Sequence, residues 1–355
     1  MTTTTGEKRD TIVIGASAGG IEALQRLLPA FTARIEASVF VVMHLPADGH
    51  SALDRVLARS TEYETAFAKP GEPILPGRVY VAPPDRHLLI DDDRVELWHG
   101  ARENRSRPAV DPLFRSAAVA RRGRVMAAVL SGLLDDGAAG IAQVQRCGGL
   151  AVVQAPDDAI EPEMPEHALF ALGGRADAVL SAAELGEYLA ERVGTPAPPA
   201  EVPPDIQREL DMLLGSISGL EALSKGGPPL ALSCPECGGP LWGVRDGRVQ
   251  RFRCHTGHTY GVDGLLSSQG TQIEQALWAA IKGLEQRSQL LRDLAREESS
   301  NRRLAAGKGF DSESKRLSLH AQTLRDVLVA SVRELAPAAA PGLARNLERS
   351  REEDD

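Results

Sequence analysis

The sequence predicts an α/β protein with a doubly wound, mostly parallel sheet and an appended β-hairpin, followed by a small zinc-binding module and a helical hairpin. Three observations support this architecture. Short apolar runs alternate with helical patterns from Thr11 to about Leu180, a cluster of cysteines and histidines follows, and two amphipathic segments come last. Runs that are apolar throughout are typical of strands buried on both faces of a parallel sheet. They cover residues 11–15, 39–43, 125–130 and 150–154.

Three further short apolar runs lie between the second and third of these strands, at residues 79–82, 87–90 and 95–98. Pro-Pro-Asp separates the first two runs and three aspartates separate the last two. Both separators favour turns. We therefore expect a hairpin or meander appended to the main sheet.

A proline-rich segment at residues 193–204 has five prolines and predicts an extended linker. We expect a first domain at residues 1–192 and a helix with a zinc-ribbon-like module at residues 205–265. Two apolar stripes at helical spacing then predict a helical hairpin over residues 266–340, with its turn near residues 307–309. A charged tail at residues 341–355 would end the chain.

The composition excludes some classes of function. The 355 residues carry a formal net charge of -9 and contain no basic run, which argues against nucleic acid as a partner. No segment approaches the roughly 20 apolar residues that span a bilayer, and the first ten residues lack the apolar stretch of a signal peptide. We therefore expect a cytoplasmic protein that is not embedded in a membrane.

The turn after the first predicted strand has the sequence Gly-Ala-Ser-Ala-Gly at residues 15–19. It fits G-x-S-x-G, a turn that presents a serine hydroxyl at the top of a sheet, next to the free N–H groups of a helix N-terminus. In a dinucleotide-binding turn, a glycine would stand at Ser17 and an acidic residue at His44. A third interpretation is that Ser17 only caps the helix.

A serine needs a base to accept its proton, and two neighbouring strand ends supply candidates. His44 follows directly on the second apolar run, and Asp135 and Asp136 lie in the glycine-rich loop after the run at 125–130. Either aspartate could orient the histidine, or simply cap the next helix. The chain order Ser, His, Asp differs from the Ser, Asp, His order of the α/β-hydrolases, so a lipase-like enzyme is disfavoured.

Together these loops resemble the catalytic domain of the chemotaxis protein-glutamate methylesterases, the CheB family. The matching stretches occur in the family's order at residues 14–20, 44–46, 81–87, 107–116, 130–140 and 164–165. The resemblance implies that residues 1–192 form a catalytic domain in which Ser17 is the nucleophile and His44 the general base and acid. It also implies that Asp136 orients His44, with backbone N–H groups of Ala18 and Leu133 as the oxyanion hole.

The same resemblance implies hydrolysis of glutamate γ-methyl esters with release of methanol, and deamidation of glutamine as a second activity. The implied partners are methylated chemoreceptor-like proteins, and a methyltransferase or other signalling proteins. The chain departs from the family at Ala18, where Thr is common, and at Leu134, where the family has a second glycine. It begins its first strand at Thr11, so we expect no receiver domain and no control by phosphorylation in cis.

Three of the four cysteines lie within 21 residues of one another in a C-x2-C-x16-C-x3-H pattern. Two close pairs of thiolate and imidazole ligands predict a structural zinc site in a reducing compartment. Four protein ligands leave no open position, so we expect Zn²⁺ to support folding and expect no cofactor in catalysis. His255 is the alternative to the last ligand, although a directly adjacent Cys-His pair is awkward to chelate. The predicted ligands are Cys234, Cys237, Cys254 and His258.

A different class of function is also compatible with the sequence. A non-catalytic signalling adaptor could keep the same fold and bind partners through the zinc module and the helical hairpin. The altered loop at Leu133 and Leu134 is the best support for this alternative, and the three candidate catalytic side chains argue against it.

Overall fold

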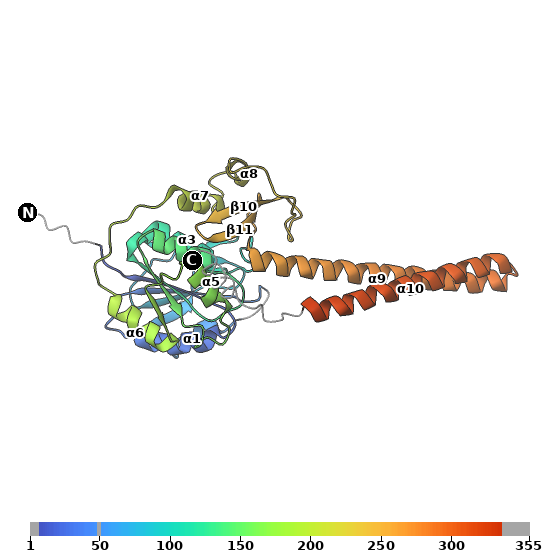
Figure 1. Ribbon diagram of the computed structural model, residues 1–355. Helices are drawn as coiled ribbons and strands as arrows, with labels where there is room; N and C mark the ends of the chain where they lie inside the picture. The colour runs from blue at the N-terminus through green and yellow to red at the C-terminus, as the bar shows by residue number, and fades with distance from the viewer. Residues whose placement is uncertain (1–6, 48–50, 336–355) are drawn as a thin grey trace, which may run out of the picture. The chain divides into compact units, whose positions relative to one another are not determined.

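The computed structural model describes residues 7–47 and 51–335, which form two compact units (Figure 1). The first unit is Met1–Leu265 and the second is Leu266–Asp355. Among the described residues, no helix combines the length and the apolar character needed to cross a membrane.

A seven-stranded sheet forms the centre of the first unit, and all its neighbouring strands pair in parallel. Strand β1 lies between β2 and β7, so the strand order reverses direction at β1. In spatial order the strands are β3 (Glu64–Phe67), β4 (Arg78–Val81), β2 (Ser38–Met43), β1 (Thr11–Ala16), β7 (Val125–Val129), β8 (Leu150–Gln154) and β9 (Ala178–Leu180).

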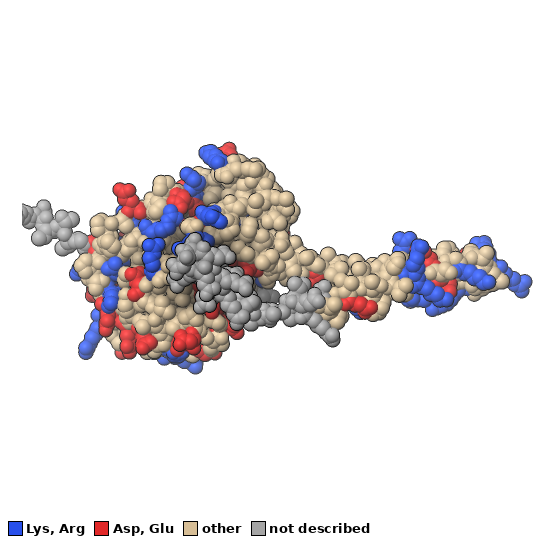
Figure 2. All heavy atoms as spheres, in the orientation of Figure 1, with Lys and Arg blue, Asp and Glu red and all other residues tan. Residues whose placement is uncertain are grey.

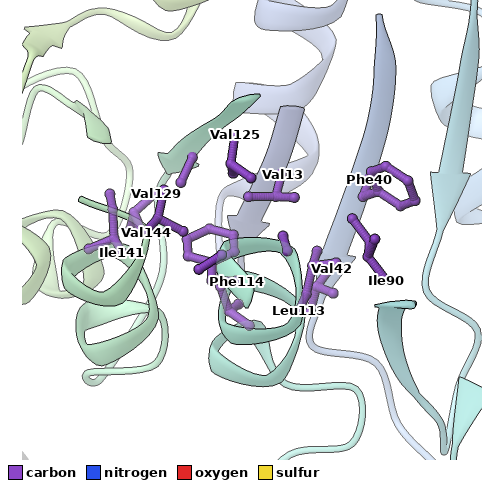
Figure 3. Packing of buried hydrophobic residues seen from close by; sticks show 14 of the residues in the cluster. Val13, Phe40, Val42, Ile90, Leu113, Phe114, Val125, Val129, Ile141 and Val144 are labelled. Atoms are coloured by element: carbon purple, nitrogen blue, oxygen red, sulfur yellow. The ribbon is translucent and has the colours of Figure 1, made fainter. Parts of the chain in front are cut away.

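Both faces of the sheet are buried, which explains why its central strands are almost entirely apolar. On β1, Val13 belongs to one hydrophobic cluster, and Ile12 and Ile14 belong to the other. Figure 3 shows Val13 and Phe114 in the first cluster. That cluster includes side chains of α3 (Val110–Arg121), α4 (Ala138–Arg146) and α5 (Glu163–Ala171); the second includes those of α1 (Gly20–Leu27), α2 (Leu53–Leu57) and α6 (Ala182–Arg192).

The predicted appended hairpin is confirmed as β5 (His87–Asp91) and β6 (Arg94–Trp98), an antiparallel pair outside the main sheet. The alternative prediction, a meander in which residues 79–82 join this hairpin, is wrong. Residues 78–81 form β4, which pairs in parallel with both β2 and β3. Strand β4 belongs to the main sheet because both of its faces are buried: Tyr80 packs in the first hydrophobic cluster and Val79 in the second.

A smaller antiparallel sheet, β10-β11-β12, follows the linker within the same compact unit. Two helices precede it, and Gly215, two residues after the end of the first, has a positive φ of 72° that interrupts the helical pattern. The elements are α7 (Pro204–Leu213), α8 (Gly219–Ser224), β10 (Leu241–Asp246), β11 (Val249–Cys254) and β12 (Thr259–Gly261).

Two long helices make up the second unit, namely α9 (Val262–Ser300), which starts at the end of the first unit, and α10 (Leu304–Leu335). Ser288 of α9 hydrogen-bonds to Ser314 and Ser318 of α10, so the two helices pack as a hairpin. The turn predicted near residues 307–309 is wrong, because α10 already begins at Leu304. Residues 336–340 of the expected hairpin and the tail at 341–355 lie outside the described residues.

On the face of the molecule drawn in Figure 2, basic and acidic side chains are interspersed over the first unit.

Candidate active site and metal site

Three side chains predicted from the sequence meet at the carboxyl-terminal edge of the main sheet. Ser17 follows β1, His44 follows β2, and Asp136 lies in the loop between β7 and α4. The Nδ1 atom of His44 lies 3.0 Å from Ser17 Oγ, and its Nε2 atom lies 2.7 Å from Asp136 Oδ2. These three loops surround β1, where the strand order of the sheet reverses, and crevices at such points are the usual ligand sites of open α/β sheets.

The orientation of the imidazole ring is a feature that the sequence did not predict. In the familiar serine triad, Nε2 faces the serine and Nδ1 faces the aspartate. Here Nδ1 of His44 faces Ser17, and Nε2 faces Asp136. The chemistry is equivalent, because Asp136 accepts a hydrogen bond from the N–H at Nε2 and leaves Nδ1 free to accept a serine proton.

Two glycines allow the chain to pass closely around Ser17. Gly19 is the N-cap of α1 with a φ of 73°, a conformation that favours glycine. A Cβ atom on Gly132 would lie 2.8 Å from the Cβ of Ser17 and 2.1 Å from the Sδ of Met164. Gly132 therefore brings the β7–α4 loop against the serine, where a larger residue would displace it.

The Asp136 carboxylate is almost completely buried, and each of its oxygens accepts several hydrogen bonds. Oδ2 accepts from His44 and from the Val110 N–H, the first residue of α3. Oδ1 accepts from a side-chain amide and two further backbone N–H groups, those of Asn104, Asp111 and Gly137. Burial alone would raise the pKa of Asp136, but these donors outweigh it and the pKa is lowered, so the carboxylate stays ionised.

Asp111 is a second buried carboxyl group beside Asp136. Its own oxygens accept hydrogen bonds from the Gly140 N–H and the Asn104 side chain. Burial first, and then the negative charge of Asp136, raise the pKa of Asp111 to about 7. The repulsion between the two carboxyl groups is thereby relieved at Asp111, while Asp136 keeps its charge.

Of the two candidate aspartates, Asp136 contacts His44, and Asp135 points elsewhere. A Cβ atom on Gly261 of β12 would lie 1.6 Å from Asp135 Oδ2, so the Asp135 carboxylate lies against that strand. Burial raises the pKa of Asp135 to about 6. The two adjacent carboxylates thus face different partners.

The two backbone amides expected to form an oxyanion hole lie in the turn after β1 and the loop after β7. Within the described part of the chain, neither the Ala18 nor the Leu133 N–H donates a hydrogen bond to another group of the protein. The next amide, that of Leu134, is occupied, because it donates to Glu163 Oε2 at 2.7 Å. The Ala18 and Leu133 amides are therefore both open to a ligand.

The four predicted metal ligands also come together, with ligand atoms within 4.8 Å of one another. Tetrahedral zinc, with Zn–S near 2.3 Å and Zn–N near 2.0 Å, separates two sulfurs by about 3.8 Å and a sulfur from a nitrogen by about 3.5 Å. Cys237 Sγ lies 3.7 Å from Cys254 Sγ, which in turn lies 3.5 Å from His258 Nδ1. The residues therefore fit a tetrahedral metal ion, and His255 does not belong to the cluster.

An outer contact orients the histidine of this cluster. His258 Nε2 lies 3.3 Å from Glu236 Oε2, so a carboxylate holds the nitrogen that does not face the sulfurs. Such carboxylate–histidine pairs are the usual support of histidine ligands.

Comparisons with known proteins place the first unit in a family. The family model described as CheB methylesterase matches residues 12–189. A relative from Leptospira interrogans is 37% identical over 179 residues, which are 50% of this chain and 92% of the relative. The "Protein-glutamate methylesterase/protein-glutamine glutaminase" of Azospirillum brasilense is 35% identical over 187 residues, and this chain spans 47% of its length.

A solved structure agrees with these matches. The crystal structure of the Thermotoga maritima CheB methylesterase catalytic domain aligns with a TM-score of 0.50 and 31% identity. The alignment covers 53% of this chain and all of that one. With a family model matched over half of its length, the chain belongs to the CheB methylesterase family.

Proposed function

We propose that this protein is a protein-glutamate methylesterase, with Ser17, His44 and Asp136 as its catalytic triad. The observation that carries the proposal is the bridge that His44 makes between Ser17 Oγ and the buried, ionised Asp136. The family membership supports the class of ester, because the relatives are named for hydrolysis at protein glutamate and glutamine side chains.

In the proposed reaction, Ser17 Oγ attacks the carbonyl carbon of a glutamyl γ-methyl ester while His44 Nδ1 takes the hydroxyl proton. The backbone N–H groups of Ala18 and Leu133 stabilise the oxyanion. As the tetrahedral intermediate collapses, the C–O bond to the methoxy group breaks and His44 returns the proton, so methanol leaves. Water then attacks the acyl-enzyme by the same route and releases the glutamate carboxylate and Ser17.

Two kinds of side chain are proposed as substrates for attack by Ser17. A methylated glutamate of a chemoreceptor-like protein is the proposed ester, and a methyltransferase would be the enzyme class that supplies it. Attack on a glutamine carboxamide by the same serine would release ammonia instead of methanol, and the relatives' names include a glutaminase activity.

The direct test is release of methanol by the whole chain from receptor fragments that carry glutamyl methyl esters. Fragments with free glutamate at the same positions serve as the matched blank, and ammonia is measured in parallel on fragments with glutamine. We expect methanol from the esters, and labelling of the folded protein at Ser17 by a fluorophosphonate. A folded protein that neither releases methanol nor labels at Ser17 would favour the adaptor function.

We also propose that the four-residue cluster binds one structural Zn²⁺. Thiolates and an imidazole suit this ion, and four protein ligands leave no position for a substrate. The ion would tie the loop before β10 to the end of β11 and to the residue before β12.

Loss of this metal is expected to destabilise the first unit. Because structural zinc sites contribute about 10 kcal/mol or more of binding energy to folding, Cys254→Ser should lose the zinc and several kcal/mol of unfolding free energy. The measurements are zinc content and chemical denaturation. His255→Ala is the matched control, since it removes a neighbouring imidazole outside the cluster. Equal zinc content and stability in Cys254→Ser and His255→Ala would contradict the assignment.

A further inference from the structure

Asn104 touches the catalytic carboxylate without touching the serine or the histidine. Its Nδ2 donates to Asp136 Oδ1 at 2.9 Å and to Asp111 Oδ2 at 3.0 Å. Both hydrogens of the amide are therefore used, one on each of two buried carboxyl groups. The side chain separates the two acids and supplies Asp136 with one of the donors that lower its pKa.

The orientation of this amide depends on β12, in the part of the chain that carries the metal ligands. The Gly261 N–H donates to Asn104 Oδ1 at 3.1 Å. A flipped amide would place its oxygen against two carboxyl groups and its NH₂ against an N–H donor. The Gly261 contact therefore selects the one orientation that donates to Asp136.

The backbone of Asn104 is held by the same strand. The Asn104 N–H donates to the Thr259 carbonyl at 2.8 Å, and the Thr259 N–H donates to the Arg102 carbonyl at 3.3 Å. Asn104 itself has a φ of 48°, which is uncommon for a residue other than glycine. Residues 102–104 thus extend the small sheet beyond β12, and an unusual backbone conformation is fixed by this pairing.

The small sheet is itself fastened to the main domain by buried charges. Arg115 of α3 makes a bidentate contact with Glu103, with N–O distances of 3.2 and 3.1 Å, and its Nε lies 3.2 Å from Glu209 of α7. Glu209 also pairs with Arg251 of β11. Despite its burial, Glu209 has a pKa lowered to about 2 by the two arginines. Removal of one partner from such a group is costly, so the sheet is held in one position.

We infer that Asn104 is a positioning residue for the catalytic carboxylate, and that β12 of the metal-binding module holds Asn104 in place. The inference rests on the proposed methylesterase function. The path of contacts runs from the metal ligand His258 to Thr259 and Gly261, then through Asn104 to Asp136. The module is consequently part of the support of the active site.

The Leptospira relative aligns with half of the present chain. Its alignment covers 92% of its own length but 50% of this chain, which leaves little of it to correspond to the metal-binding module. In this chain, deletion of residues 205–355 would also strip Arg115 of its Glu209 contact, so truncation is a poor test.

Single substitutions in the full chain test the inference. Gly261→Ala would place a methyl group 1.6, 2.3 and 2.7 Å from the Oδ2, Cγ and Oδ1 atoms of the buried Asp135 carboxyl group, so we expect β12 to shift away from Asn104. Gly264→Ala, three residues later, would place its methyl group 3.7 Å from Asp135, an ordinary contact. We expect kcat for methanol release to fall about tenfold or more in Gly261→Ala, since small misplacements of catalytic groups have effects of this size, with KM little changed. Gly264→Ala should stay within about twofold of the wild type.

A double variant distinguishes displacement of β12 from a general loss of stability. Asp135→Ala removes the carboxylate that the new methyl group would meet, so Gly261→Ala should cost less than about threefold when added to it. Asn104→Ala should lower kcat as Gly261→Ala does. It should also move the acidic limb of the kcat/KM profile to higher pH, because an Asp136 carboxylate with one donor fewer accepts a stronger hydrogen bond from His44, and the coupled carboxylate–imidazole pair then takes up its proton at higher pH. A merely structural role would leave that limb in place.

Hydrogen exchange gives a readout that does not depend on activity. The amides of residues 102–104 should exchange faster after removal of zinc by a chelator, and in Gly261→Ala, than in the zinc-loaded wild type. Unchanged kcat in Gly261→Ala, or unchanged exchange at residues 102–104 after metal removal, would overturn the inference. Failure of the proposed function is a separate result, in which the wild type itself releases no methanol while the exchange experiment still reports on the contact.

Discussion

Replacement of Ser17 by alanine is expected to lower kcat for methanol release by a factor on the order of 10⁶, the scale on which removal of a triad nucleophile acts. The substitution deletes the oxygen that lies 3.0 Å from His44 Nδ1 and leaves no atom to form the acyl-enzyme. The alanine side chain fits, because it is smaller than the serine that it replaces. The measurements are methanol release, fluorophosphonate labelling and thermal unfolding.

Ser216→Ala is the matched control for this experiment, because Ser216 is an exposed serine in a turn of the same unit. It should keep the wild-type kcat and the wild-type labelling. Ser17→Ala should unfold at the wild-type temperature and carry no label. Methanol release within tenfold of the wild type in the Ser17→Ala protein would mean that another nucleophile acts.

The central part of the fold could be predicted because strands buried on both faces appear in the sequence as continuous apolar runs. Strands β1, β2, β7 and β8 are apolar apart from a polar end residue in three of them, and each was expected at nearly its observed place. The edge strand β3 has the sequence ETAF and is only partly buried, so it leaves no such mark. Strand β4 is apolar, but its closeness in sequence to the β5–β6 hairpin suggested the wrong partner.

The meeting of Ser17, His44 and Asp136 could be predicted because these residues stand at fixed points of the topology. In a parallel sheet, residues that follow adjacent strands lie at one edge, and this brings Ser17 and His44 together regardless of their separation in sequence. The same reasoning left Asp135 and Asp136 as alternatives. The family resemblance then singled out Asp136, and the three-dimensional path of the loop shows that this carboxylate reaches the imidazole and which nitrogen it meets.

Asn104 had no comparable signal. It belongs to an irregular segment, has a positive φ, and contacts a strand 157 residues later in the chain. The contact exists because buried charges fasten the small sheet to α3 and because Gly261 lacks a side chain. Neither condition can be read from a local pattern of residues.

Replacement of Asp136 by asparagine is expected to lower kcat by about 10⁴-fold, the size of effect that a wrong histidine tautomer produces in a serine triad. Both carboxylate oxygens face N–H donors, so the NH₂ group of asparagine must oppose donors in either orientation. In place of Oδ1 it would oppose the donors of Asn104, Asp111 and Gly137. In place of Oδ2 it would oppose the Val110 N–H and His44 Nε2.

The second orientation leaves fewer donors opposed, and His44 can adapt to it by moving its proton from Nε2 to Nδ1. That tautomer points an N–H at Ser17 and cannot accept the serine proton, which is why kcat should fall although the residues of the site remain in place. Asp135→Asn is the matched control, because the neighbouring carboxylate faces Gly261 and not His44, and its kcat should stay within a few-fold of the wild type. The reverse pattern would be an inactive Asp135→Asn and an Asp136→Asn that retains more than about a tenth of the wild-type kcat, far more than is expected after loss of a triad aspartate. That result would assign the orienting carboxylate to Asp135.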